Sequence, residues 1–582
     1  MKIQFRFIFI FLGIVCPFIP EVNAQQIYLS GTAKASIEPK SYPFSVALAG
    51  YGYPRGGRFS VDWIKTDDHH GFFSESRQQK RWKKLAVNSI AYAVLNKVMY
   101  AADKGGSITY TSIRGKSVNW QKLTQLEGIT GLAAYRGRLF ALTANDELFR
   151  FELKDKSGDW VKFAKFNGLS YNVHLKSIAI IRDKLYGLDK NNVVYEARHK
   201  TDGNLSVAAV AISTEKQTVV IVGTDVCGFN HDFIYAIKQE IFTKYKIAPA
   251  AILINASHTH FAPSTQDWTT WGTHQLPDSV YLNGVVKPAM TGVIERAIKT
   301  MKPSALSFGR GKTVIGSNRS LEGADVPYDN DVDVLHIERN KDHHKTVVFL
   351  TGCHPVFKNE GMEGFTISAN YPGITKNLLE KGTETIDALF IQGCGGDINP
   401  VSNDHIQTGK DLAADVKNVL NRPMENLEGG ISFYLDSLNF PVNRWSNEHI
   451  HTFREKNEDK VDVDAEKNVR WADLMLRRDK DNKIPSSMPV YIQTINIGSW
   501  KLVGLSREAV TDYSIGIKKI WPGKLVSVAG YCNDVSSYLP TSRHIQAGTY
   551  EGFSSFFWYG QPSVFPLNVY ETIIDKIKTQ NR

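Results

Sequence analysis

The chain has 582 residues, of which 42% are hydrophobic, 22% charged and 11% aromatic, and its formal net charge is +10. This composition excludes a generally disordered protein, and the length is sufficient for roughly two or three domains around a large core. The basic residues are spread along the chain, so the excess charge favours solubility and excludes a nucleic-acid-binding protein built on long basic runs.

The N-terminus has the pattern of an export signal. Lys2 and Arg6 precede the apolar run 7–15, and Val22-Asn23-Ala24 is a suitable cleavage site. We therefore predict that residues 1–24 are a signal peptide and that the mature protein is secreted or periplasmic. No later run approaches the roughly 20 apolar residues of a membrane-spanning helix.

Residues 27–60 are expected to form strands and a glycine-rich turn, and an internal repeat follows. Trp82, Trp120 and Trp160 each open a repeat unit, with spacings of 38 and 40 residues. Each unit continues with short apolar and aromatic strands separated by polar turns, which resembles the blades of β-propeller or tectonin-like proteins. We expect the tryptophans to pack in the cores of these blades.

From about residue 205 the pattern changes to alternating strands and helices. Helices are predicted over 232–245 and 285–301, and a charge-dense helical excursion over 456–483. Strands are predicted over 207–212, 218–223, 346–351 and 388–392. The fold class is therefore α/β. The four cysteines of the mature chain, which lie far apart, are predicted to be buried thiols, with two disulfides as the alternative. They are Cys227, Cys353, Cys394 and Cys532.

Two histidines follow the buried run Ala251-Ile252-Leu253-Ile254, in Ser257-His258-Thr259-His260. If the strand continues, side chains two residues apart point the same way, so His258 and His260 meet on one face. The pair is either part of a metal site or a pair of hydrogen-bonded structural histidines.

Further polar residues stand at strand ends or in glycine-rich turns. His354 follows one strand, Glu508 ends another, and the loop 392–400 is rich in glycine. Two histidines and one glutamate are a recurring ligand set for catalytic zinc, with one coordination position left for water.

The order of these motifs resembles that of the neutral, non-lysosomal ceramidases, a family of zinc-dependent amide hydrolases. The resemblance spans roughly residues 27–63 and 200–575. The matching pieces are Gly31-Thr32-Ala33-Lys34, Ala49-Gly50-Tyr51-Gly52, Ala256-Ser257-His258-Thr259-His260, Asn318-Arg319-Ser320, Cys353-His354-Pro355, the loop 392–400, Arg507-Glu508, Tyr538-Leu539-Pro540-Thr541 and Tyr550-Glu551-Gly552.

The resemblance implies a Zn²⁺ site with four protein ligands, namely His258, His354, Glu508 and Tyr538. It also implies that His260, Arg319 and Tyr550 line the site and bind or polarise the amide of an N-acylated, ceramide-like lipid. Hydroxide bound to the metal would then attack the carbonyl carbon. The implied fold is a mixed-sheet catalytic domain formed by residues 25–70 and 200–582. Residues 71–199, which carry the β-repeats, would interrupt it as an insertion.

Three features depart from the family pattern. Asn399 stands where the ceramidases have a serine, and an amide cannot replace a hydroxyl nucleophile, although it can orient a substrate. The sequence after Gly552 is too short for the family's C-terminal immunoglobulin-like domain, and the repeat insertion is unusual. These features leave two alternatives open: a hydrolase of amide or ester bonds in an extracellular glycan or glycoconjugate, contacted by the repeats, or a non-enzymatic binding protein.

Overall fold

The structure is a computed structural model. It describes residues 28–39, 61–65, 89–113, 119–135, 137–153, 160–165, 174–181, 184–268, 270, 276–323, 326–358, 366–381, 386–460 and 462–580. The predicted signal peptide, the glycine-rich turn at 49–52 and the first repeat tryptophan, Trp82, lie outside the described residues.

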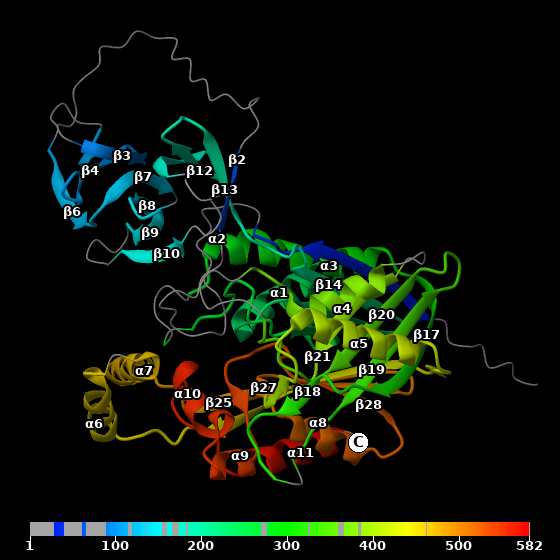
Figure 1. The fold of residues 1–582 in the computed structure, drawn as a ribbon. Coiled ribbons are helices and arrows are strands. Elements are labelled where there is room, and N and C mark those ends of the chain that lie inside the picture. Colours follow the sequence, from blue (N-terminus) through cyan, green and yellow to red (C-terminus); the bar gives the residue numbers. More distant parts are fainter. Residues whose placement is uncertain are drawn as a thin grey trace, which may run out of the picture.

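A nine-stranded mixed sheet is the centre of the fold (Figure 1). Its two parallel pairs lie at the two ends of the strand order, and the remaining neighbours are antiparallel. In spatial order the strands are β16 (Ile252–Ala256), β15 (Thr218–Thr224), β14 (Ser206–Ser213), β1 (Tyr28–Ser36), β17 (Lys302–Lys312), β19 (Asp331–Arg339), β20 (Lys345–Thr351) and β21 (Ile386–Gln392), with β23 (Glu425–Asn426) beside β17. This architecture confirms the predicted α/β class with a mixed sheet.

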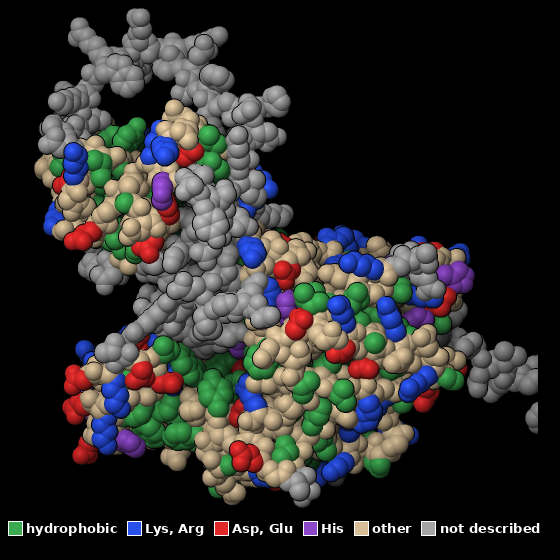
Figure 2. Space-filling model, viewed as in Figure 1, with side chains coloured by type: hydrophobic (Ala, Val, Ile, Leu, Met, Phe, Trp, Pro, Cys, Tyr) green, Lys and Arg blue, Asp and Glu red, His purple; other side chains and the backbone are tan. Residues whose placement is uncertain are grey.

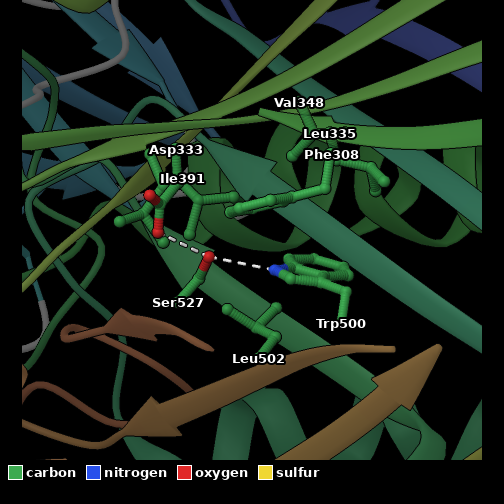
Figure 3. A pocket seen from close by; sticks show the side chains of 9 residues that line it. Phe308, Asp333, Leu335, Val348, Ile391, Trp500, Leu502 and Ser527 are labelled. Carbon is green, nitrogen blue, oxygen red and sulfur yellow. Dashed lines mark hydrogen bonds between the residues drawn. The ribbon is translucent and has the colours of Figure 1, made fainter. Parts of the chain in front are cut away.

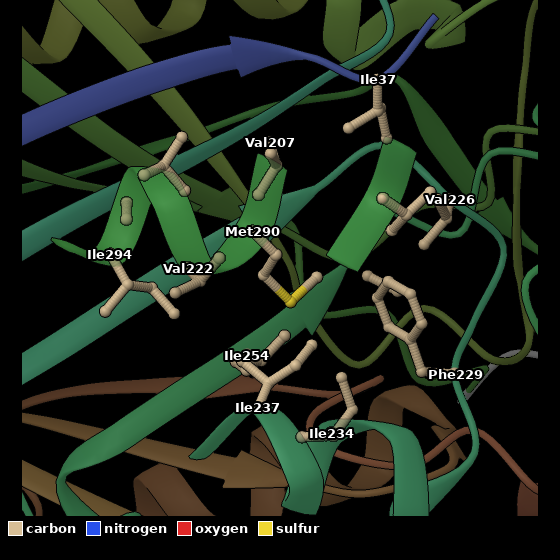
Figure 4. Close-up of a cluster of buried hydrophobic side chains, with 14 of the residues drawn as sticks. Ile37, Val207, Val222, Val226, Phe229, Ile234, Ile237, Ile254, Met290 and Ile294 are labelled. Carbon is tan, nitrogen blue, oxygen red and sulfur yellow. The ribbon is translucent and has the colours of Figure 1, made fainter. Parts of the chain in front are cut away.

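Helices cover one face of this sheet. Apolar residues of α1 (His231–Tyr245) and α3 (Lys287–Lys299) pack on β14, β15 and β16, as Figure 4 shows for Ile234, Ile237 and Met290. Helices α4 (Asn370–Glu380) and α5 (His405–Leu420) pack on β19, β20 and β21. The helices predicted over 232–245 and 285–301 are therefore confirmed, and their apolar stripes form the first core.

A second sheet packs on the other face of the first. It contains β24 (Ile431–Pro441), β25 (Ser487–Ile497), β26 (Trp500–Leu505) and β28 (Leu525–Ala529). Alternation along β26 sends Trp500 and Leu502 toward the large sheet. Val503 and Leu505 face the opposite way and pack against α8 (Thr511–Ile520) and α11 (Val569–Thr579). The described residues outside the repeat region thus form four layers: helices, sheet, sheet and helices.

Polar contacts are buried where the two sheets face each other (Figure 3). The indole Nε1 of Trp500 donates to Ser527 Oγ at 3.0 Å, and that hydroxyl donates to Asp333 Oδ2 at 2.6 Å. Asp333 also receives hydrogen bonds from the guanidinium of Arg310. These hydrogen bonds satisfy the buried polar groups of Trp500, Ser527 and Asp333 and connect the two sheets.

The repeat region forms three four-stranded antiparallel sheets. The first contains β3 (Ser89–Leu95), β4 (Val98–Asp103), β5 (Ser107–Ser112) and β6 (Gln121–Gln125). The second contains β7 (Ile129–Tyr135), β8 (Arg138–Thr143), β9 (Glu147–Glu152) and β10 (Val161–Lys165). The third contains β11 (Leu175–Ile181), β12 (Lys184–Asp189) and β13 (Val194–His199), and is completed by β2 (Val61–Lys65) from the other end of the region. Trp120 and Trp160 directly precede the fourth strands of the first two sheets, so they mark the end of each sheet rather than its start.

Other predicted features are also accounted for. The helical excursion is the pair α6 (Asn447–Glu458) and α7 (Val463–Lys480). The four cysteines of the described chain are buried free thiols, as expected. No helix among the described residues has both the length and the apolar character needed to cross a membrane.

Asn255, near the end of β16, joins the two edge strands of the nine-stranded sheet. Its Oδ1 accepts from the backbone N–H of Gln392 in β21 at 2.8 Å, and its Nδ2 donates to the carbonyls of Gln392 and Gly530 at 3.2 and 2.7 Å. The side chain is fully buried. The sheet therefore curls so that β16 and β21 approach each other, and the chain segments that follow them meet.

We predict that Asn255→Leu destabilises the fold, because it leaves buried backbone groups of Gln392 and Gly530 unpaired. The expected loss is about 1–3 kcal/mol for each buried group left without a partner. Urea unfolding followed by circular dichroism measures it, with Asn418→Leu, at an exposed position of α5, as the control. Equal midpoints for the two variants would contradict this role of Asn255.

Candidate metal centre

His258 lies two residues beyond the end of β16 and has a backbone φ of 65°. The chain therefore leaves the strand before the first histidine, and the expected continuation of the strand through His260 is wrong. The two imidazoles still meet, because the turn brings His260 Nε2 to 3.1 Å from His258 Nε2. A left-handed conformation at a non-glycine residue is unfavourable, and it marks a position where the surroundings determine the backbone.

Backbone carbonyls orient two of the predicted ligands. The Nδ1–H of His258 donates to the carbonyl of Cys227, and the Nδ1–H of His354 donates to the carbonyl of Gly395, each at 2.6 Å. A carbonyl oxygen can only accept, so Nδ1 carries the proton in both rings. Each Nε2 is thereby directed inward as a potential ligand atom, which is the usual way in which proteins prepare histidines for a metal.

Glu508, at the start of β27 (Glu508–Ala509), completes the group. Its Oε2 lies 2.9 Å from His258 Nε2 and 3.1 Å from His354 Nε2. The three side chains are at most 1% exposed, and their ligand atoms all lie within 4.8 Å of one another. Two imidazole nitrogens and a carboxylate oxygen that face each other in the interior need a positive charge between them, either a proton or a metal ion. These donors fit a zinc ion.

Tyr538 stands beside this group because β29 (Tyr538–Leu539) pairs with β27, with Tyr538 in register with Glu508. The Tyr538 hydroxyl is 3.5 Å from His354 Nε2 and receives a hydrogen bond of 3.0 Å from Arg319 Nη2. Burial and then the charge of Glu508 raise the pKa of Tyr538 well above 10, although Arg319 opposes this. A phenolate ligand at this position therefore depends on the charge of the metal ion itself.

The ionisation of the three inner groups follows from burial and mutual charge. Burial alone would lower the pKa of His258, but Cys227 and Glu508 raise it to about 10. Burial, followed by the charge of Arg319, lowers the pKa of His354 to about 4. Burial would raise the pKa of Glu508, yet His258 and His354 hold it well below its usual range. A proton shared by this group stands where a metal ion would bind.

Arg319 is held at the edge of the group by several acceptors. Its Nε donates to Glu551 Oε1 at 2.9 Å, its Nη1 to Asn399 Oδ1 at 3.0 Å and its Nη2 to the Gly396 carbonyl at 3.0 Å. Its guanidinium carbon lies 5.8 Å from the centre of the Tyr550 ring. The structure therefore fixes one positive charge beside the predicted ligands.

All eight residues predicted for the site come together. The ligand set and His260 are central, whereas Tyr550, which is 40% exposed, and Asn399 lie at the rim with Arg319. The roles assigned to these residues from the resemblance remain predictions.

Two contacts of the site residues were not predicted from the sequence. Tyr559 donates a hydrogen bond to Glu508 Oε1, and Glu551 forms the buried ion pair with Arg319. Glu551 stands in a matching motif, next to Tyr550, but the resemblance assigned no role to it. Nothing in the aromatic run Phe556-Phe557-Trp558-Tyr559 distinguishes Tyr559 from a core residue.

Comparison with known proteins supports the fold. No protein-family model matches the chain, and no curated protein sequence matches it. Among solved structures, neutral ceramidase from Pseudomonas aeruginosa is similar, with a TM-score of 0.51 and 16% identity over 64% of this chain and 68% of that chain. A ceramidase complexed with C2 gives a TM-score of 0.50 and 15% identity over the same shares of the two chains. The predicted resemblance to the neutral ceramidases is thus confirmed at the level of the fold, and the fold places a buried group capable of holding a metal.

We predict that Tyr559→Phe weakens metal binding by about 10–100-fold, because Glu508 loses the hydroxyl that holds its second oxygen. Titration calorimetry of the metal-free protein with Zn²⁺ measures the change. Tyr434→Phe, at a tyrosine that is 47% exposed, is the control and should bind as the unaltered protein does. Equal affinities in the two variants would show that Tyr559 does not position Glu508.

Proposed function

We propose that this protein is an exported, zinc-dependent hydrolase that cleaves the amide bond of an N-acylated, ceramide-like lipid. The observation that carries the proposal is the convergence of His258 Nε2, His354 Nε2 and Glu508 Oε2 on one buried point. The ceramidase-like fold supports it.

In this proposal His258, His354 and Glu508 hold the zinc ion, and the Tyr538 hydroxyl is the fourth protein ligand. Zinc, when bound, supplies a Lewis acid and lowers the pKa of a coordinated water toward about 7. The carbonyls of Cys227 and Gly395 keep both imidazoles in the ligand tautomer.

The residues around the group bind the reacting amide. Arg319, fixed by Glu551 and Asn399, offers a positive charge to the oxygen of the scissile carbonyl, and Tyr550 offers a hydroxyl from the rim. His260 Nε2 is placed beside His258 to take a proton from the attacking water and pass it to the leaving amine. Asn399 Oδ1 is engaged by Arg319, so its remaining N–H groups are suited to orient the substrate.

Apolar surface beside the site favours an acyl chain over a sugar. Hydrophobic side chains gather over α7 and α10 (Ser555–Trp558), next to a hollow in the surface (Figure 2). Phe553 is 41% exposed and packs against Phe556 and Phe557, which join the aromatic cluster around Trp471. Exposed apolar surface marks a contact with a protein, a membrane or a ligand, and the acyl chain of a lipid is such a ligand.

The second candidate is hydrolysis of an amide or ester bond in an extracellular glycan or glycoconjugate. The three β-sheets, interpreted as propeller-like blades, would contact the glycan, and Tyr92 on β3, which is 70% exposed, is the kind of side chain that stacks on sugars. A purely binding role is the least supported, because the buried donor group is complete.

We predict that removing the metal abolishes hydrolysis of short-chain ceramide. A chelator, and separately Glu508→Gln, should lower the rate at least about 100-fold, since the metal supplies several kcal/mol of transition-state stabilisation. Release of fatty acid is measured beside release of acetate from N-acetylated sugars. Glu215→Gln, in an exposed turn, should retain full activity. Chelator-sensitive release of acetate alone would favour the glycan candidate, and no release from either would contradict an amidase.

We predict that Arg319→Lys lowers kcat by about 100-fold, because a lysine keeps the charge but cannot make the four directed hydrogen bonds of the guanidinium. Steady-state kinetics measures kcat and KM for the substrate identified above. Arg422→Lys, at an exposed position, is the matched control. An unchanged kcat with a raised KM would show that Arg319 binds the substrate without stabilising the transition state.

A further inference from the structure

A second group of metal-type donors lies outside the site just described. Asp397 in the loop after β21, Asp512 in the first turn of α8 and His544 in α9 (Ser542–Gln546) each offer one ligand atom, and these atoms lie within 4.8 Å of one another. The side chains of Asp397 and His544 are fully buried, and that of Asp512 is 17% exposed.

Hydrogen bonds hold the three side chains, and Asp397 uses both of its oxygens in them. Asp397 Oδ1 accepts from the backbone N–H of Thr511 at 2.8 Å, and its Oδ2 accepts from Asn318 Nδ2 at 2.7 Å. His544 Nδ1 pairs with Thr541 Oγ1 at 2.9 Å. Asp512 Oδ1 accepts from the guanidinium of Arg543 at 2.7 Å. These contacts fix the orientation of all three side chains.

Two of the atoms that face the centre of the group have no hydrogen-bond partner among the described residues. Within the described part of the chain, His544 Nε2 and Asp512 Oδ2 are buried and have no hydrogen-bond partner. His544 Nε2 lies 3.5 Å from Asp397 Oδ2, longer than the usual N–H···O hydrogen bond. An imidazole nitrogen and two carboxylates thus face each other, and leaving such groups uncompensated in the interior is costly.

A proton or a metal ion can compensate them, and the geometry distinguishes the two. A proton on His544 Nε2 points to one acceptor at a time and leaves Asp512 Oδ2 without a donor. One cation at the centre of the group would contact all three atoms, which lie within 4.8 Å of one another.

From this geometry we propose a second metal site, formed by Asp397, Asp512 and His544, that binds a divalent first-row transition metal such as Zn²⁺. An imidazole among the donors favours such an ion over Ca²⁺ or Mg²⁺, which prefer oxygen ligands alone. The second site shares no ligand with the first, so it can bind a metal whether or not the protein is a hydrolase.

The ion in this site braces the loop on which the first site depends. The carbonyl of Asp397 accepts from the backbone N–H of Arg319 at 2.9 Å. The preceding residues, Gly396 and Gly395, provide the carbonyls that hold the Arg319 side chain and the His354 ring. A metal bound to Asp397 therefore fixes the loop that orients both.

Metal counting tests the proposal. Each protein is loaded with Zn²⁺, freed of unbound metal by gel filtration and analysed for zinc. We expect about two zinc ions per chain in the unaltered protein, about one in Glu508→Gln, about one in His544→Gln and none in the double variant. His451→Gln, at an exposed histidine of α6, should keep both.

The outcomes separate the two sites. One zinc ion in the unaltered protein and in His544→Gln, with none in Glu508→Gln, would overturn the second site and leave the first. One zinc ion in the unaltered protein and in Glu508→Gln, with none in His544→Gln, would overturn the first site and leave the second.

A second variant tests the site in case His544→Gln does not fold. Asp512→Asn retains an oxygen for Arg543 but removes the negative charge that faces His544. In the Glu508→Gln background, added Zn²⁺ should raise the melting temperature, and Asp512→Asn should abolish that rise. An equal rise with and without Asp512→Asn would overturn the proposal.

Discussion

The side chain of Asn255 is the contact on which the candidate metal centre depends. Two edge strands of one sheet would ordinarily stand far apart, yet this amide connects β16 to β21 and also to Gly530, just beyond β28 of the second sheet. His258 follows β16, and the loop that orients His354 follows β21. The geometry of the site is therefore inherited from the curvature of the sheet, and a small number of buried hydrogen bonds maintains that curvature.

The two donor groups are arranged in the same way. In each, hydrogen bonds with neighbouring groups orient the ligand side chains, so that a ring nitrogen and a carboxylate face the centre of the group. At the first group the carbonyls of Cys227 and Gly395 do this, and at the second Thr541 and Arg543 do it. A group of this kind is stabilised by a positive charge at its centre, which a proton or a metal ion supplies.

Sequence patterns predicted many of the helices and strands, because local periodicity reflects which face of an element is buried. The strand at 218–223 and the helix at 232–245 were correctly predicted for this reason. The packing of one sheet on the other was not predicted. The alternation of side chains along β26 shows that both faces are buried, but not whether a sheet or a helix covers each face. In the site, His258 and Glu508 were found from residue types at strand ends. Tyr559 and Asn255 were missed, because their roles depend on partners 51 and 137 residues away.

The ligands of the first group are separated by long stretches of chain, from His258 through His354 to Glu508. In an unfolded chain they are isolated side chains with no common geometry, so tight metal binding arises only after both sheets have formed and packed. Under the proposed function, metal binding therefore follows folding, and only a correctly folded chain gains the extra stability that the ion would confer.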